Sequence, residues 1–291
     1  MGIKLIKGDC FDVMPSLEAH SFDLIIADLP YGTTSCKWDS PLPLNDYIMV
    51  GKHRLSKDDY KLFGLLKEMS LDEIMSTWEK ESQLGLWSHY RRLLKDNGVI
   101  VLFGQEPFSS TVRMSNMDWY RYDWVWQKEK PSNFQLMGYQ CGRVHENIMV
   151  FSPKKACYTS NGNSMRYFPI MEKREKVRKA NVKIYGDMKN NILHTYKKGT
   201  VDNFKEYDEK FPISVLKFNN EVHKVHQTQK PLDLVEYLIK TYSLEEDKVL
   251  DNCMGSGTAG VACKKLNRDF VGIEIRDDYF EIAENRVNNE A

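Results

Sequence analysis

Four consecutive residues, Asp28-Leu29-Pro30-Tyr31, combine groups that can hold a planar amine. The amino group of adenine or cytosine is a poor nucleophile because its lone pair is delocalised into the ring. Asp28 and the carbonyl of Pro30 can each accept one N–H hydrogen bond from it, and proline fixes its own φ angle, which preorganises that carbonyl. Tyr31 offers a face on which a base can stack, worth on the order of 1–3 kcal/mol. The motif suggests chemistry on a base flipped out of a duplex, with an ordinary Asp/Pro turn as the alternative.

A second motif is typical of a turn that approaches a nucleotide-like ligand. Asp251-Asn252-Cys253-Met254-Gly255-Ser256-Gly257-Thr258 contains glycines that allow close approach, and Glu274 follows where a carboxylate can accept hydrogen bonds from ribose hydroxyls. The stretch 255–260 also fits the pattern G-x-G-x-x-G, so a nicotinamide cofactor is an alternative. Four residues precede the first glycine, and the anion of Asp251 is awkward beside a pyrophosphate. Both features favour a cationic sulfonium cofactor.

Apolar strand-like runs alternate with helical patterns along most of the chain. Strands are expected at 3–7, 22–27, 99–103, 122–126, 148–151, 248–251 and 270–275. Helices are expected at 12–17, over most of 44–95, from Pro231 onward, at 258–266 and at 278–287. The stretch Ser70-Leu71-Asp72-Glu73 is a capping box within the second of these regions. The alternation predicts an α/β fold with a mostly parallel, doubly wound sheet, and both motifs follow strands of that sheet.

The charge of the chain is unevenly distributed although its net charge is zero. Residues 153–230 hold 17 Lys/Arg and 8 Asp/Glu, a net of +9, and the remainder is correspondingly acidic. A basic segment in an acidic body indicates a lobe that binds a polyanion, while a solvated lysine-rich surface is the alternative.

The composition is that of a folded protein with a substantial core. Hydrophobic residues make up 42% of the chain, and no apolar run reaches the roughly 18 residues that a membrane span needs. The start of the chain has no signal-peptide pattern, and the six cysteines show neither Cys-x-x-Cys pairs nor zinc spacing. We therefore expect reduced thiols, no metal and a cytoplasmic location.

Both motifs resemble those of amino DNA methyltransferases that use S-adenosylmethionine. Residues 28–31 resemble the catalytic Asp-Pro-Pro-Tyr motif, with Leu29 in place of the first proline. Residues 251–258 resemble the cofactor motif Asp-Pro-Phe-x-Gly-Ser-Gly-Thr, from which 252–254 depart. Residues 226–231 resemble the stretch His-Pro-Thr-Gln-Lys-Pro, and 145–151 resemble a further strand of the family. The order of the motifs is similar to that of the beta class, which has a permuted Rossmann-like sheet with helices on both faces. The strand near residue 6 would then lie beside the Glu274 strand.

The resemblance implies a domain organisation and a reaction. Residues 1–153 and 223–291 would form the catalytic domain, with a helical insertion at about 45–90, and 154–222 would form a small target-recognition region. The implied reaction is site-specific methylation of N6 of adenine in double-stranded DNA, in a restriction–modification setting, by an enzyme that forms a homodimer. Aspartate rather than serine at position 28 favours adenine over N4 of cytosine. The alternatives are N4-cytosine methylation, an RNA or glutamine substrate, and a non-catalytic DNA-binding relative.

The resemblance also assigns individual residues. Asp28 and Pro30 would orient the amine and Tyr31 would stack the base. The residues assigned to S-adenosylmethionine are Asp9, Cys10, Asp28, Thr228, Lys230, Asp251, Met254, Gly255, Gly257, Thr258 and Glu274.

Overall fold

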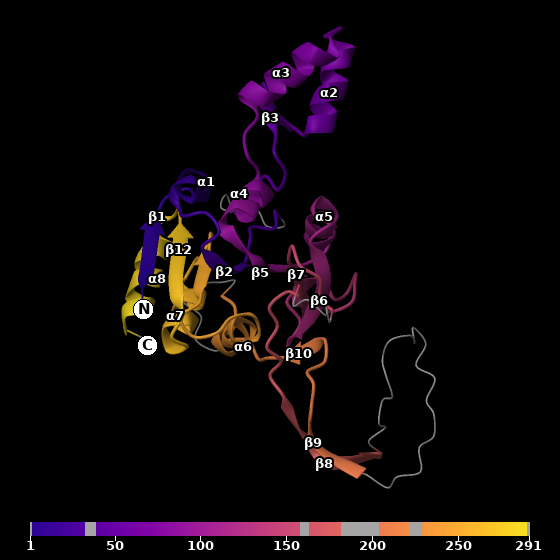
Figure 1. The fold of residues 1–291 in the computed structure, drawn as a ribbon, viewed down its shortest axis with the longest axis vertical. Helices are drawn as coiled ribbons and strands as arrows, with labels where there is room; N and C mark the ends of the chain where they lie inside the picture. Colours follow the sequence, from indigo (N-terminus) through magenta and orange to yellow (C-terminus); the bar gives the residue numbers. More distant parts are fainter. Residues whose placement is uncertain (1, 33–38, 158–162, 182–203, 222–228, 290–291) are drawn as a thin grey trace. The chain divides into compact units, whose positions relative to one another are not determined.

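The computed structural model describes residues 2–32, 39–157, 163–181, 204–221 and 229–289 (Figure 1). The chain forms two compact units. The first comprises Met1–Phe168 and Ser214–Ala291, and the second is Pro169–Ile213. Among the described helices, none is both long and apolar enough to cross a membrane.

The first unit is built on one eight-stranded sheet. Its strands, in spatial order, are β1 (Ile3–Lys7), β12 (Asp269–Glu274), β11 (Lys248–Asp251), β2 (Phe22–Ala27), β5 (Leu94–Gly104), β7 (His145–Phe151), β6 (Tyr120–Gln127) and β10 (Val215–Lys217). Strand β7 is antiparallel to both of its neighbours, and the other pairs are parallel. This confirms the predicted mostly parallel sheet, including the position of β1 beside β12.

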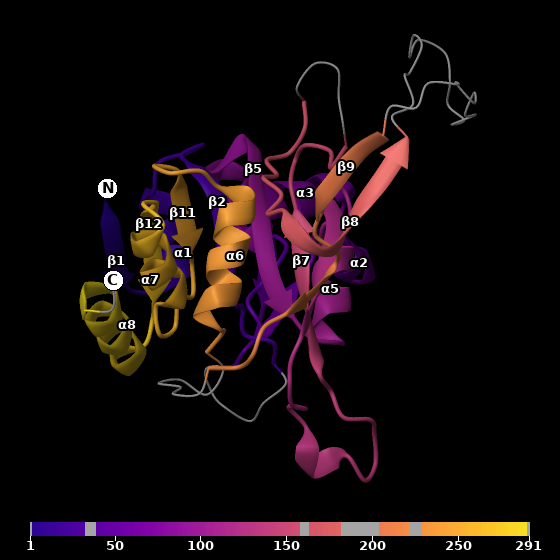
Figure 2. The same cartoon turned by 90° about the horizontal axis from the view of Figure 1, so that it is seen from below.

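Helices cover both faces of this sheet because its strands are apolar on both sides. On one face, Leu24 and Ile26 of β2 pack in a core with residues of α6 (Leu232–Tyr242), α7 (Thr258–Lys265) and α8 (Asp277–Asn289). On the other face, Ile25 packs with residues of α1 (Cys10–Val13), η1 (Met14–Ser16), α4 (Leu86–Leu93) and α5 (Phe108–Ser115). Figure 2 shows α6 and α7 on one face of the sheet. Successive residues of β2 thus anchor opposite helical layers, as the alternation of a strand requires.

The order of the strands brings the two sequence motifs together. Strands β2 and β11 are parallel neighbours, with Leu24 opposite Val249 and Ile25 opposite Leu250. Parallel strands end at the same edge of a sheet, so Asp28 and Asp251, which are more than 200 residues apart in the chain, emerge side by side. Strand β12 is the next neighbour of β11, and Glu274 ends it at the same edge.

The segment between β2 and α4 has its own small core. It contains β3 (Ile48–Val50), β4 (His53–Leu55), α2 (Lys57–Leu66) and α3 (Leu71–Glu81), and Ile48, Tyr60, Ile74 and Trp78 pack together in it. The capping box at Ser70 and Glu73 is confirmed at the start of α3. The expectation that 44–95 is helical was wrong for 48–55, which pair as an antiparallel hairpin.

The expected start of the strand after α4 was also wrong. We expected this strand to begin at residue 99, but α4 ends at Leu93 and β5 begins at Leu94. The register explains the error, because Phe22 pairs with Leu94 and Leu24 pairs with Val99. The residues between 94 and 99 therefore form an irregularity in the strand rather than a helix cap.

The second unit is a hairpin of two antiparallel strands, β8 (Glu172–Asn181) and β9 (Phe204–Lys210). It is shorter than the predicted 154–222 region, because both ends of that region belong to the first unit. Arg166 forms an ion pair with Asp23 at 2.8 Å and another with Asp247. At the other end, β10 joins the main sheet beside β6. The role of this region in target recognition remains a prediction.

Candidate active site

The Asp28–Tyr31 motif forms a compact hydrogen-bonded turn at the end of β2. The Tyr31 hydroxyl donates to Oδ1 of Asp28 at 2.7 Å, and Lys230 forms an ion pair with Oδ2. The Asp28 side chain is 27% exposed, so a ligand can reach it. Leu29 is buried in the core on the α4 side of the sheet, which shows why an apolar residue can replace proline here.

The aromatic ring of Tyr31 is held by its surroundings. It stacks on Phe108 with 5.0 Å between the ring centroids and 27° between the planes. Burial, followed by the charges of Asp28 and Glu146, raises the pKa of the phenol well above its usual value. The hydroxyl therefore stays protonated and donates to Asp28 throughout the ordinary pH range.

A chain of alternating buried charges continues from Asp28. Lys230 lies 3.5 Å from Oε2 of Glu146, and Oε1 of Glu146 pairs with Lys128. Burial opposes ionisation of Glu146, but the two lysines outweigh it and lower the pKa of that carboxyl. Burial likewise opposes the charge of Lys230. The negative charges of Asp28 and Glu146 outweigh this effect and raise the pKa of the ammonium. The group Asp28, Lys230, Glu146 and Lys128 is balanced in charge, and we call it the charge chain.

Sequence reasoning missed Glu146 and Lys128. Glu146 lies near the start of β7, and the apolar run Ile148–Phe151 completes that strand. A carboxylate in a strand that is otherwise buried needs a cationic partner, and this was the available signal. Lys128, which directly follows β6, lies 4.8 Å above the ring of Trp126.

The glycine loop after β11 has a backbone that other residues adopt only with strain. Gly255 and Gly257 have φ angles of +52° and +74°. A Cβ atom on Gly257 would lie 2.9 Å from the Cβ of Ala283 in α8, so this glycine also permits close helix packing. A Cβ on Gly255 would meet nothing within 4 Å, so Gly255 borders open space. Met254 precedes it and is buried.

The loop is tied to the neighbouring strand ends. Oε2 of Glu274 accepts a hydrogen bond from the Gly255 amide at 2.9 Å, and Oε1 accepts from the Arg276 amide at 2.9 Å. The Cys253 thiol donates to the Asp28 carbonyl at 3.5 Å. The two motifs therefore share direct contacts and form one site.

Asp251 is a buried carboxyl with an anionic environment. It accepts one hydrogen bond from the Cys253 amide at 3.1 Å, and burial, with the charges of Asp28 and Glu274, raises its pKa to about 8. Within the described ranges, no lysine or arginine forms an ion pair with Asp251. A carboxylate held in this way is stabilised by a cationic ligand, so the site fits a sulfonium cofactor better than a pyrophosphate.

The remaining predicted site residues have varied positions. Asp9 follows β1, and its side chain caps α1 by accepting from the Phe11 amide at 2.9 Å. Burial raises the pKa of the Cys10 thiol to about 12. The Thr258 hydroxyl accepts from Arg286 at 3.2 Å and so faces α8. Thr228 lies outside the described residues. The cofactor contacts of all these residues remain predictions.

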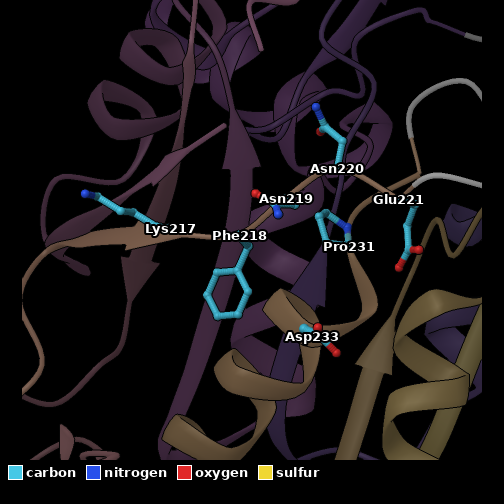
Figure 3. Close-up of a pocket in the computed structure, with 7 residues that line it drawn as sticks. All are labelled: Lys217, Phe218, Asn219, Asn220, Glu221, Pro231 and Asp233. Carbon is cyan, nitrogen blue, oxygen red and sulfur yellow. The ribbon is translucent and has the colours of Figure 1, made fainter. Parts of the chain in front are cut away.

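A cavity of about 440 Å³ lies beside the start of α6 (Figure 3). Residues of the segment after β10 and of the start of α6 line it: Lys217, Phe218, Asn219, Asn220, Glu221, Pro231 and Asp233. Of the predicted catalytic and cofactor residues that the structure describes, none lines this cavity, and Lys230 directly precedes Pro231 of its lining.

The sheet order, the glycine loop and the acidic ends of β11 and β12 together define a Rossmann-like methyltransferase. The chain belongs to the DNA methylase family, whose model matches residues 22–285. Enzymes of this family take their methyl group from S-adenosylmethionine.

Known relatives extend over nearly the whole chain. The chain is 28% identical over 289 residues to the Type II methyltransferase M.HinfI of Haemophilus influenzae, which covers 97% of this chain and 67% of the relative. It is 27% identical over 297 residues to the Type II methyltransferase M.HpaI of Haemophilus parainfluenzae. This match covers 100% of this chain and 76% of the relative.

Solved structures share the fold. The complex of M1.HpyAVI with SAM has a TM-score of 0.53 and 21% identity, and the match covers 98% of this chain and 99% of that one. The cytosine-N4-specific PvuII DNA methyltransferase has a TM-score of 0.56 and 14% identity, over 98% and 86% of the two chains. At these identities the similarity shows a shared fold. It does not decide whether the methylated base is adenine or cytosine.

Proposed function

We propose that the protein is a site-specific DNA methyltransferase that acts on N6 of a flipped-out adenine. The observation that carries this proposal is the meeting of the two motifs. The partly exposed carboxylate of Asp28 lies beside the acidic loop of Asp251, and Cys253 contacts both. A base amine at Asp28 would then face a methyl donor held by the glycine loop.

The proposed catalytic roles belong to three residues of the turn after β2. Asp28 and the Pro30 carbonyl accept the two N–H bonds of the amine, which directs its lone pair toward the cofactor. Tyr31 holds Asp28 through its hydroxyl and offers the ring face not covered by Phe108 to the base. The rate enhancement comes from positioning and electrostatics, and the amine loses its proton during or after attack.

The proposed cofactor site lies at the ends of β1, β11 and β12. When bound, S-adenosylmethionine supplies a methyl group activated by its positive sulfur. Asp251 and Asp28 supply the compensating negative charge, Glu274 binds the ribose hydroxyls, and Gly255 leaves room for close approach. The other proposed contacts are Asp9, Cys10, Thr228, Lys230, Met254, Gly257 and Thr258.

The proposed DNA-facing region includes the second unit. Lys173, Lys176 and Arg178 of β8 are exposed and can pair with phosphates. We propose that this unit forms the core of the target-recognition region, and that the active enzyme is a homodimer in the bacterial or virus-infected cytoplasm.

The experiment is transfer of labelled methyl groups from S-adenosylmethionine to methyl-free genomic DNA. The product nucleosides are separated by mass, and sequencing maps the modified sites. Wild type is compared with Asp28→Asn and with Asp58→Asn, a matched change at an exposed aspartate in α2. We expect N6-methyladenine from wild type and Asp58→Asn and at least a hundredfold less from Asp28→Asn.

Each other outcome changes the proposal in a defined way. N4-methylcytosine would keep the mechanism and replace the base. No methylation of DNA despite measurable binding of S-adenosylmethionine would exclude the proposed activity.

A further inference from the structure

Both oxygens of the Asp28 carboxylate are engaged before any base arrives. Oδ1 accepts from Tyr31 and Oδ2 pairs with Lys230. The proposed reaction needs one of these oxygens to accept an N–H of the amine. Each oxygen keeps a second lone pair, but the amine would approach a carboxylate that already holds a phenol and an ammonium. Departure of one donor would make an oxygen of Asp28 fully available to the amine, and the structure indicates which donor can leave.

Lys230 is the donor with an alternative partner. Its ammonium lies 3.5 Å from Oε2 of Glu146, and the Lys230 and Glu146 side chains are each only 8% exposed. Oε1 of Glu146 accepts from Lys128 and, at 3.2 Å, from Gln105. Oε2 is buried and makes no hydrogen bond within the described part of the chain. Glu146 thus has an acceptor in reserve on the side that faces Lys230.

We propose that Lys230 is a movable cation that pairs with Asp28 before the base enters and shifts to Glu146 when the amine takes Oδ2. Glu146 is then a positioning residue, because it acts on the reaction through Lys230. This inference rests on the proposed function.

The charges of the site favour such a shift. The charge chain contains two carboxylates and two ammonium groups, so the move transfers no proton and leaves the net charge unchanged. A buried ammonium without a partner is strongly destabilising, and Glu146 provides a partner while Asp28 holds the amine. Lys128 keeps Oε1 of Glu146 occupied, which fixes the carboxylate with Oε2 toward Lys230.

The rival explanation is that Glu146 only stabilises the fold by neutralising two buried lysines. That role predicts a lower melting temperature and weaker binding of every ligand after substitution. If Glu146 instead receives Lys230, the effect of substituting Glu146 on kcat depends on whether Lys230 is present. A double-mutant cycle measures this dependence.

The experiment compares Glu146→Gln, Lys230→Met and the double variant on duplex DNA that contains the mapped site. We expect Glu146→Gln to lower kcat roughly 10- to 100-fold, because Lys230 then competes with the amine for Asp28. We expect the dissociation constant of S-adenosylmethionine to change less than threefold. In the double variant, kcat should equal that of Lys230→Met alone. If the two substitutions instead lower kcat independently, so that their fold-losses multiply in the double variant, the proposal is overturned.

Two further arms keep the test decisive. Glu146→Asp keeps the acceptor and should be at least fivefold faster than Glu146→Gln, and it serves if the glutamine variant does not fold. Glu106→Gln removes an exposed carboxylate that pairs with Arg113 at 2.8 Å, and it should retain wild-type kcat. Equal losses in the aspartate and glutamine variants would also overturn the receiving role.

A direct readout follows base entry itself. With 2-aminopurine at the target position, wild type should raise its fluorescence on binding, and Glu146→Gln should give a smaller rise. An equal rise would contradict competition at Asp28. Failure of the proposed function is distinguishable, because wild type would then methylate no DNA and no cycle could be measured.

Discussion

At the scale of single residues, the site is organised by how each carboxylate is compensated. Asp28 has a phenol and an ammonium, and Glu274 has two backbone amides. Asp251 has one amide and an environment that disfavours its charge. Of these three carboxylates, Asp251 is therefore the one that a cationic ligand stabilises most.

Binding of S-adenosylmethionine should strengthen as the pH rises from 6 to 8. With its pKa raised to about 8, Asp251 of the free protein is mostly protonated at pH 6 and about half protonated at pH 8, whereas a sulfonium favours the carboxylate. Binding then releases a proton, and the dissociation constant should fall by up to about tenfold per pH unit. Titration calorimetry in buffers of different ionisation enthalpy measures both effects.

Asp251→Asn is the control for this pH dependence. It keeps the acceptor for the Cys253 amide and removes the titration. We expect weaker binding with no proton release in the variant. A wild-type affinity that is independent of pH would contradict the assignment.

The hydroxyl of Tyr31 should contribute separately from its ring. Tyr31→Phe removes the 2.7 Å hydrogen bond to Asp28 and keeps the stacking surface, so we expect kcat to fall about tenfold. Tyr31→Ala removes both and should cost at least tenfold more. Steady-state kinetics on the mapped site checks this. A wild-type kcat in Tyr31→Phe would show that the hydroxyl has no separate effect, and equal losses in the two variants would show that the ring has none.

At the scale of elements, local patterns identified most strands but not their irregularities. The apolar run at 22–27 and the alternation of strands and helices predicted the sheet, because burial on both faces selects such runs. The segment 94–98 could not be read in this way. Its Asn97-Gly98 pair resembles a helix stop, and only the pairing with β2 makes it part of β5. Glu146 was missed for a related reason, since its partners Lys128 and Lys230 are distant in sequence.

The two glycines of the loop should respond differently to alanine. Gly257→Ala forces a side chain into positive φ and against Ala283, so the free energy of unfolding should fall by about 2–4 kcal/mol. Gly255→Ala meets no neighbouring atom and should cost only about 1 kcal/mol, from its backbone conformation.

Ligand binding separates the two variants further. Gly255→Ala should weaken S-adenosylmethionine at least tenfold because its methyl group points into open space at the site. Denaturant unfolding and calorimetry measure the two quantities. A Gly255→Ala variant with normal affinity would place the cofactor elsewhere.

At the scale of the whole molecule, a permuted chain order assembles one site from distant segments. The motif order predicted β1 beside β12 and both motifs at one edge, because parallel strands share their carboxyl ends. The limits of the second unit could not be predicted from charge. Arg166 is basic like its neighbours, yet it binds Asp23 and Asp247 of the main unit. Composition does not distinguish a cation paired within the fold from one available to DNA.

The second unit offers the final test of how the molecule holds its substrate. Replacing Lys173, Lys176 and Arg178 by alanine should raise KM for DNA roughly 10- to 100-fold at moderate salt and leave the affinity for S-adenosylmethionine unchanged. Each lost phosphate contact also reduces the slope of log affinity against log salt by about 0.9, so the slope should fall by up to about three. The matched control replaces Lys57, Lys61 and Lys67, which are exposed on and beside α2. If the control weakens DNA binding as much as the β8 variant does, bulk charge and not the second unit holds the DNA. If only the β8 variant changes the set of methylated sequences, the same unit also contributes to reading them.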